Sequence, residues 1–168
     1  MSVKAAYDLV FKVWEYLDSG ENKSPGPITH EFSVDFDLTS GTVVGSADLV
    51  WSDRRSRTTG ASEVLDLAGV LTDSFGTTIT FVEIVLVAIR NRDTVDGEDF
   101  QVGPDATNGW VGMVMDASDR IRVPAGGHVI WYDPNGQAVG AGATDELWIQ
   151  NDGSSTNQYD IIIVGRSA

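Results

Sequence analysis

The sequence contains no cysteine. This absence excludes a disulfide framework and a thiolate zinc site, and it fits a reducing compartment. Long apolar runs are also missing, because no stretch approaches the roughly 18 consecutive apolar residues of a membrane-spanning helix. The first residues, MSVKAAYDLVFKVWEYLD, lack the apolar core and cleavage site of a signal peptide. We therefore expect a soluble protein that is made in the cytoplasm and has no membrane partner.

Basic side chains are scarce. The chain has 11 Lys and Arg against 25 Asp and Glu, which gives a net charge of −14. An acidic surface repels phosphate backbones, and the only basic cluster consists of Arg54, Arg55 and Arg57. The sequence thus predicts no nucleic-acid partner, and the dispersed acids are typical of a solvated surface.

Histidine is almost absent, since His30 and His128 are the only two. Nucleophilic catalysis by a serine needs a nearby base, and no G-x-S-x-G motif is present. The glycine-rich segment 136–144 lacks the Lys-Ser/Thr pair of a phosphate-binding loop. We expect neither enzymatic activity nor a cofactor.

Residues 28–39, ITHEFSVDFDLT, alternate between apolar and polar types without a break. Successive side chains of a strand point to opposite faces, so this pattern predicts a strand with one buried face. At about 12 residues the run is roughly twice the length of a typical strand. The predicted buried face carries Ile28, His30, Phe32, Val34, Phe36 and Leu38.

Residues 7–17 are compatible with an amphipathic helix or with a strand. Their aromatic and β-branched content favours the strand. The segment DSGENKSPGP, residues 18–27, is rich in turn formers, so the two strands would form a long hairpin. We expect an N-terminal β-hairpin arm over residues 1–40, a flexible joint over 41–47 and a β-sandwich body over 48–168.

The body is predicted to be all-β. From Asp48 onward, short apolar runs alternate with Gly, Asn, Asp and Pro clusters, which is typical of a β-sandwich or jelly roll. The runs near 77–90 and 158–165 are apolar on both faces, as central strands would be. Other strands are expected near 48–52, 62–67, 99–103, 109–115, 119–123, 127–132 and 145–150.

One loop concentrates carboxylates. Asp93, Asp96, Glu98 and Asp99 lie within seven residues, and Ca²⁺ accepts such oxygen ligands. We expect these acids to solvate the surface and no metal to bind, with a calcium site as the alternative.

Trp110 lies in ATNGWVG, where a loop is expected to enter a strand. An exposed aromatic ring can stack on a sugar, whereas a buried one fills the sandwich core. Trp110 is thus the candidate ligand aromatic, with a core position as the alternative.

Several segments resemble a recurring group of tailed-bacteriophage proteins encoded among virion structural genes. They are LVWSDRRS (49–56), EVLDLAGVLTDSFGTTITF (63–81), VGPDATNGWVG (102–112), DRIRVPAGGHVIWYDPNGQAVGAGATDELWIQND (119–152) and YDIIIVGRSA (159–168). The resemblance implies a virion component of jelly-roll or sandwich type that forms a homo-oligomer, a trimer by analogy. It carries no catalytic residues, and it implies the major capsid protein or other virion proteins as partners.

A long amphipathic strand is suited to adding itself to the sheet of another subunit. The predicted interface is Ile28, Phe32, Val34, Phe36 and Leu38, and the alternative is that the arm packs on its own sandwich. We expect a capsid decoration (cement) protein that binds the outside of the head. The alternative function is a tail, baseplate or fibre-associated component, including a carbohydrate-binding module.

Overall fold

A computed structural model of the protein describes residues 5–15 and 28–168, with side chains from residue 37 onward. Over these ranges the secondary structure consists of β-strands and turns, with no helix. The all-β prediction is confirmed. The described part of the chain also contains no helix that is long and apolar enough to cross a membrane.

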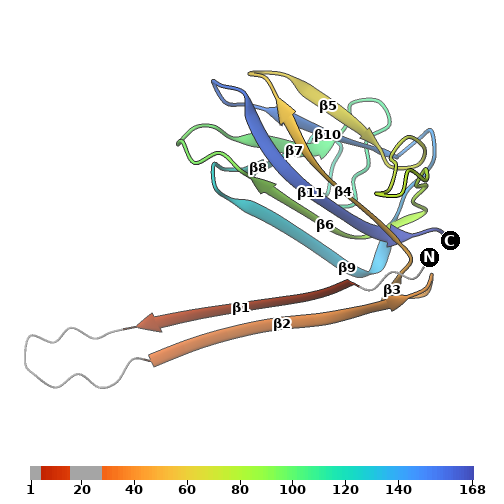
Figure 1. Ribbon diagram of the computed structural model, residues 1–168, viewed down its shortest axis with the longest axis horizontal. Coiled ribbons are helices and arrows are strands. Elements are labelled where there is room, and N and C mark those ends of the chain that lie inside the picture. Colours follow the sequence, from red (N-terminus) through yellow and green to blue (C-terminus); the bar gives the residue numbers. More distant parts are fainter. Residues whose placement is uncertain (1–4, 16–27) are drawn as a thin grey trace, which may run out of the picture.

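The body is a sandwich of two four-stranded sheets (Figure 1). One sheet has the order β5-β10-β7-β8 and the other β4-β11-β6-β9, and all pairings within them are antiparallel. Within the body, the strands β4 to β7 pair in reverse order with the strands β8 to β11: β4 with β11, β5 with β10, β6 with β9 and β7 with β8. Their bounds are β4 (Leu49–Arg57), β5 (Ser62–Asp66), β6 (Glu83–Asn91), β7 (Phe100–Pro104), β8 (Ile121–Val123), β9 (His128–Ala138), β10 (Glu146–Asn151) and β11 (Asn157–Arg166).

The core lies between the two sheets. Alternate residues of each strand point inward, so Ile161 and Ile163 of β11 are buried together with Val87 and Ile89 of β6. As predicted, β6 and β11 are the two central strands of their sheet. Val85 and Leu86 of β6 are buried outside this core, in a second apolar cluster on the other side of the sheet.

Two strand predictions for the body are wrong in part. Within residues 109–115 only Gly109 makes an isolated bridge, to Glu146, and residues 112–115 turn, because the amide of Val114 bonds to the carbonyl of Val111 and the amide of Met115 bonds to the side chain of Asp119. Such local bonds compete with a strand ladder. The strand expected at 77–90 begins only at Glu83, because Ile79 and Phe81 donate to carbonyls of the 67–71 loop.

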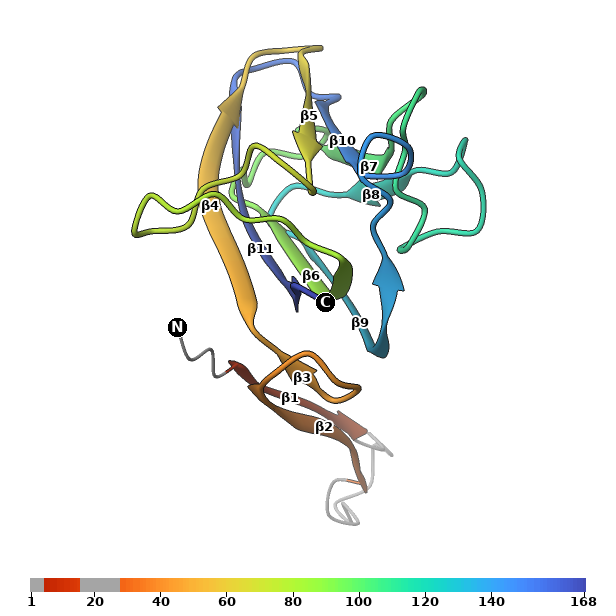
Figure 2. The same ribbon diagram turned by 90° about the vertical axis from the view of Figure 1, so that its right-hand side faces the viewer.

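The hairpin consists of β1 (Ala5–Glu15) and β2 (Ile28–Ser40), paired antiparallel from Ala5↔Leu38 to Glu15↔Ile28. The strand interpretation of residues 7–17 is therefore confirmed over the helix. A two-residue strand, β3 (Ser46–Ala47), pairs with the end of β2 in parallel. The hairpin lies outside the sandwich and diverges from β9 toward its tip (Figures 1 and 2).

The expected flexible joint, residues 41–47, is instead a hydrogen-bonded turn fastened to the body. The amide of Gly45 donates to the carbonyl of Pro134 (3.2 Å), and Val43 donates to the hydroxyl of Ser46 (2.9 Å). Ser46 and Ala47 are fully buried. Turn bonds of this kind are not visible in a small-residue sequence such as SGTVVGSA, which is why composition indicated a joint.

Candidate functional site

The register of the hairpin sorts its residues onto two faces. Residues paired across an antiparallel ladder share a face, and successive residues alternate. One face holds most of the apolar positions of both strands, and the other holds most of the acidic positions together with Val10 and Trp14. On the apolar face the paired residues are Tyr7 and Phe36, Leu9 and Val34, Phe11 and Phe32, and Val13 and His30. On the acidic face Asp8 pairs with Asp35 and Lys12 with Glu31, and Asp37 lies on the same face.

Leu38 shows which face turns toward the body. It belongs to the apolar face, since it pairs with Ala5 two positions beyond Tyr7↔Phe36. Its side chain is 1% exposed and packs with Ala47, Val85, Leu86 and Val164. The apolar face of the hairpin is therefore the one directed toward the sheet β4-β11-β6-β9 at the root.

The predicted interface residues divide into two groups. Ile28, Phe32, Val34 and Phe36 lie on β2, but their side chains are outside the described residues. Leu38 is buried against the body of its own chain. For this residue the packing is intramolecular, because the turn 41–47 holds the end of β2 on the sheet.

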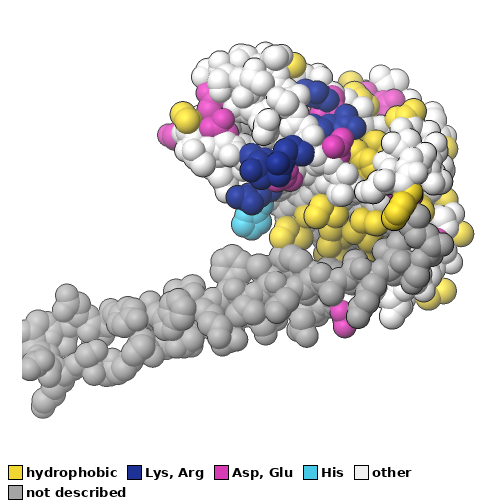
Figure 3. Space-filling view, in the orientation of Figure 1, with side chains coloured by type: hydrophobic (Ala, Val, Ile, Leu, Met, Phe, Trp, Pro, Cys, Tyr) yellow, Lys and Arg dark blue, Asp and Glu magenta, His cyan; other side chains and the backbone are white. Residues whose placement is uncertain are grey.

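The outer face of the sheet β4-β11-β6-β9 is apolar next to the hairpin root. Figure 3 shows hydrophobic side chains gathered on this lower side of the body, beside arginines and a histidine. Ile162 is 44% exposed and Val50 39% exposed, although both lie within the sheet. The strand pairings align two rows here: Val50, Val164, Leu86 and Tyr132, followed by Ser52, Ile162, Ala88 and Ile130.

The next row on this face is charged. It consists of Arg54, Asp160, Arg90 and His128, again aligned by the strand pairings. Asp160 accepts from the Nε of Arg54 (2.7 Å) and from Arg92 (2.9 Å), and these two guanidinium groups lower the pKa of its carboxyl. We call these five residues the arginine row.

Arg90 stands out within the arginine row. It is exposed, and no carboxylate among the described residues pairs with it. Guanidinium groups bind carboxylates in a fork geometry, and the remainder of this acidic chain repels anions. The arrangement can therefore receive an acidic segment of a partner.

Sequence reasoning missed the arginine row. In the sequence Arg54 forms a run with Arg55 and Arg57. In the structure those two arginines pair with Glu63 and do not belong to the arginine row. Arg90 and Arg92 join Arg54 only through the pairing of β11 with both β4 and β6. A weak signal existed, since every basic residue from 48 to 168 is an arginine.

The four carboxylates of the candidate calcium loop do not converge. Asp93 accepts the amides of Thr94 and Val95, and Asp96 is exposed. Asp99 pairs with Arg122 and accepts the amide of Ala125. The part of the chain that the structure describes contains no group of three or more potential metal ligands.

Glu98, the remaining acid of that loop, points into the protein. Its carboxylate accepts hydrogen bonds from the backbone amide of Ser154, from the amide and the hydroxyl of Ser155, and from the side-chain amide of Asn157. The side-chain bond from Ser154, with the further donors, lowers the pKa of Glu98 to about 2. Glu98 therefore clamps the 98–99 loop to the 151–157 loop and has no free oxygen for a metal.

Trp110 is not an exposed ligand aromatic. It is 2% exposed, its indole N–H donates to the carbonyl of Ala138 (3.1 Å), and its ring packs edge-on against Trp131 at 5.6 Å. A buried ring offers no face to a sugar. The core alternative is correct for Trp110, because its amide bonds to the carbonyl of Glu146 in β10 and its side chain lies in the main core cluster.

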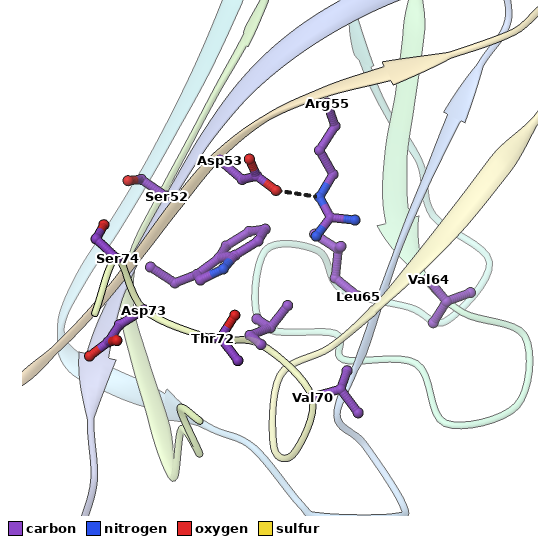
Figure 4. A pocket seen from close by; sticks show the side chains of 11 residues that line it. Ser52, Asp53, Arg55, Val64, Leu65, Val70, Thr72, Asp73 and Ser74 are labelled. Carbon is purple, nitrogen blue, oxygen red and sulfur yellow. Dashed lines mark ion pairs between the residues drawn. The ribbon is translucent and has the colours of Figure 1, made fainter. Parts of the chain in front are cut away.

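A groove of about 330 Å³ lies at the open edge between β4 and β5. Figure 4 shows Arg55 above the indole ring between Ser52 and Thr72, with Asp53 paired to Arg55. That ring belongs to Trp51, which is 4% exposed, and the guanidinium carbon of Arg55 stands 5.3 Å from its centroid. Because Arg55 already covers the ring, the groove has a polar rim but no free aromatic surface.

Comparison with known protein families, with curated proteins and with solved structures finds no match to this chain. The function is therefore inferred from the geometry of the hairpin and of the outer sheet face.

Proposed function

We propose that the chain is a non-enzymatic structural protein of a tailed-phage virion, a capsid decoration protein that attaches to its neighbours through the hairpin β1–β2. The observation that carries this proposal is the position of the hairpin outside the sandwich. Over the described residues, β1 pairs with β2 alone, and β2 pairs further only at Thr39 and Ser40.

A two-stranded ribbon is only marginally stable in water by itself. It also presents unpaired main-chain groups along its edges, which are suited to pairing with a strand of another subunit. A partner that covers the hairpin would bury its apolar face and pair its free edges. Burying Phe32, Val34 and Phe36 is worth about 1.5–3 kcal/mol each before the cost of ordering.

The fold of the body supports a virion role. Its eight strands form two four-stranded sheets in which the chain is folded back on itself, and we propose that this sandwich is a jelly roll. Double-sheet jelly rolls occur in viral capsid proteins and in lectins. The sequence segments that resemble tailed-phage virion proteins favour the former.

The experiment compares two single substitutions in the full-length chain. Phe36→Asp places a carboxylate on the apolar face of β2 and should cost several kcal/mol in a buried contact. Ser33→Asp introduces the same charge on the acidic face and is the matched control. We expect Phe36→Asp to abolish co-sedimentation with capsids that lack the protein, while Ser33→Asp still binds and both variants keep the thermal unfolding of the body.

A Phe36→Asp variant that melts much earlier, yet still co-sediments below its melting temperature, would contradict the proposal. It would mean that the apolar face serves the chain's own sandwich. Cryo-electron microscopy of the intact particle then separates the head from the tail or baseplate as the site of attachment.

A further inference from the structure

Three guanidinium groups of the arginine row share a single carboxylate. Asp160 binds the Nε of Arg54 with one oxygen (2.7 Å) and a terminal nitrogen of Arg92 with the other (2.9 Å). Within the described part of the chain Arg90 forms no ion pair, although Asp160 is its direct cross-strand neighbour. Because both oxygens of Asp160 are occupied, three guanidinium groups against one carboxylate leave an excess of two positive charges in the row.

The arginines of the row keep free hydrogen-bond donors at the surface. A guanidinium group has five N–H donors, and the side chain of Arg54 is 58% exposed while only its Nε is bound to Asp160. Arg90 is exposed, and none of its side-chain donors is bound within the described residues. The two oxygens of a carboxylate match a pair of parallel guanidinium donors. A carboxylate is therefore the ligand that fits Arg90.

An exposed apolar residue adjoins the arginine row. Ile162 lies on the same face as Asp160, two positions along β11, and it is 44% exposed within a central strand. Side chains two positions apart on one face of a strand are separated by about 6.8 Å. Arg92, whose amide continues the pairing with Gln158, lies at the same spacing from Arg90 on the other side. Figure 3 shows basic and apolar side chains exposed next to each other on this side of the body.

The arginine row lies away from the place where the hairpin root is fastened. Leu38 packs on Val164 of β11 and Leu86 of β6. Asp160 and Arg90 are four positions further along these two strands, which corresponds to about 14 Å. A segment bound to the row therefore does not have to pass between the hairpin root and the sheet.

We propose that the arginine row is the docking site for an extended acidic segment of a different protein. The segment places an apolar residue on Ile162 and, two and four positions further along, Asp or Glu on Arg90 and Arg92. Alternate side chains of an extended chain share one face, so their spacing equals that of these three residues along the strands. Two copies of this chain, each with a net charge of −14, repel each other, which favours a partner of different composition. The inference goes beyond the proposed function, because it uses a surface other than the hairpin.

The test is a titration of the full-length protein with two synthetic peptides, followed by the amide chemical shifts in NMR spectra. The peptide TVTETET places valine and both glutamates on one face of an extended chain. The control peptide TEVTTET has the same composition, but its valine and its glutamates lie on opposite faces. We expect TVTETET to shift the amides of residues 88–92 and 160–162 saturably, and the control peptide to bind at least about threefold more weakly, because its apolar and charged contacts cannot form together.

Three variants of the protein identify the contact. Arg90→Glu should raise the dissociation constant of TVTETET at least about tenfold, which corresponds to about 1.4 kcal/mol. Arg90→Lys keeps the charge but not the fork geometry, and its dissociation constant should lie between those two values. The matched control is Arg120→Glu, which makes the same charge change at an exposed site near Trp148 on the other sheet and should leave the dissociation constant within about twofold.

The absence of saturable shifts, equal binding of the two peptides, or a dissociation constant that Arg90→Glu leaves unchanged would overturn the inference. A thymidine oligonucleotide that shifts the same amides at lower concentration than TVTETET would also overturn it, since the row would then be a phosphate site. Self-association that Arg90→Glu abolishes in sedimentation velocity would assign the row to a second copy instead. The titration contains no capsids, so its failure leaves the attachment through the hairpin standing, and a failure of co-sedimentation leaves the docking site standing.

Discussion

The body and the hairpin are both made of antiparallel strands, but they bury their apolar residues in different ways. In the body, each inward face lies against a second sheet, so Ile161 and Ile163 are almost completely inaccessible. In the hairpin, Leu38 is buried only because the turn 41–47 brings it onto the outer sheet face. A strand is stabilised by a second layer, and one copy provides that layer for the body and for the hairpin root.

The largest effect is expected from a change that opens the core of the body. Trp110→Ala should lower the free energy of unfolding by about 3–5 kcal/mol, because the cavity would lie in a closed core. The melting temperature should fall by about 2–4 °C per kcal/mol for a chain of this size. Met115→Ala, at a side chain that is 97% exposed, is the control. Equal melting of the two variants would show that Trp110 is not part of a single cooperative core.

A smaller and local effect is expected at the hairpin root. Leu38→Ala removes about 2–3 kcal/mol from the second apolar cluster, which lies outside the main core. Hydrogen exchange should accelerate at residues 39–47, while the amides of β6 and β11 that face the core keep their protection. Faster exchange throughout the body would show that the hairpin root and the body unfold as one unit.

The hydrogen bonds of Glu98 to residues 154–157 should contribute to the stability of the body. Its pKa is lowered to about 2 from the ordinary value of 4.5, so its contribution is present above about pH 4.5 and is lost as the pH falls toward 2. Glu98→Gln cannot titrate and should melt earlier at pH 7. The melting temperatures of the two proteins should converge toward pH 2. Asp96→Asn, at the exposed acid of the same loop, should follow the unmodified curve, and a constant separation for Glu98→Gln would contradict the clamp.

The smallest effect is expected from calcium. The carboxylates of Glu98 and Asp99 are occupied by protein donors, so millimolar Ca²⁺ should leave the melting temperature nearly unchanged. A bound ion would stabilise the body by about 2.7 kcal/mol at a hundred times its dissociation constant. A calcium-dependent rise that EDTA reverses would show that the loop rearranges to form a site.

The elements that depend on local alternation follow from the amino-acid sequence alone. The period of two in ITHEFSVDFDLT specifies β2, because only a strand separates such residues onto two faces. The runs around Val87 and Ile163 are apolar on both faces, which predicted the central strands β6 and β11. The all-β class follows from the same patterns.

Which distant residues share a surface depends on how the strands pair and pack in three dimensions. Trp110 follows a loop signal and is nevertheless buried, since its side chain lies in the main core cluster and its indole N–H bonds to the carbonyl of Ala138. Arg54, Arg90 and Arg92 lie on three segments that meet because β11 pairs with both β4 and β6. Register across a sheet is set by the whole core, whereas alternation along one strand carries no information about its neighbours. For this reason the two faces of the hairpin could be predicted from the sequence, whereas the arginine row could not.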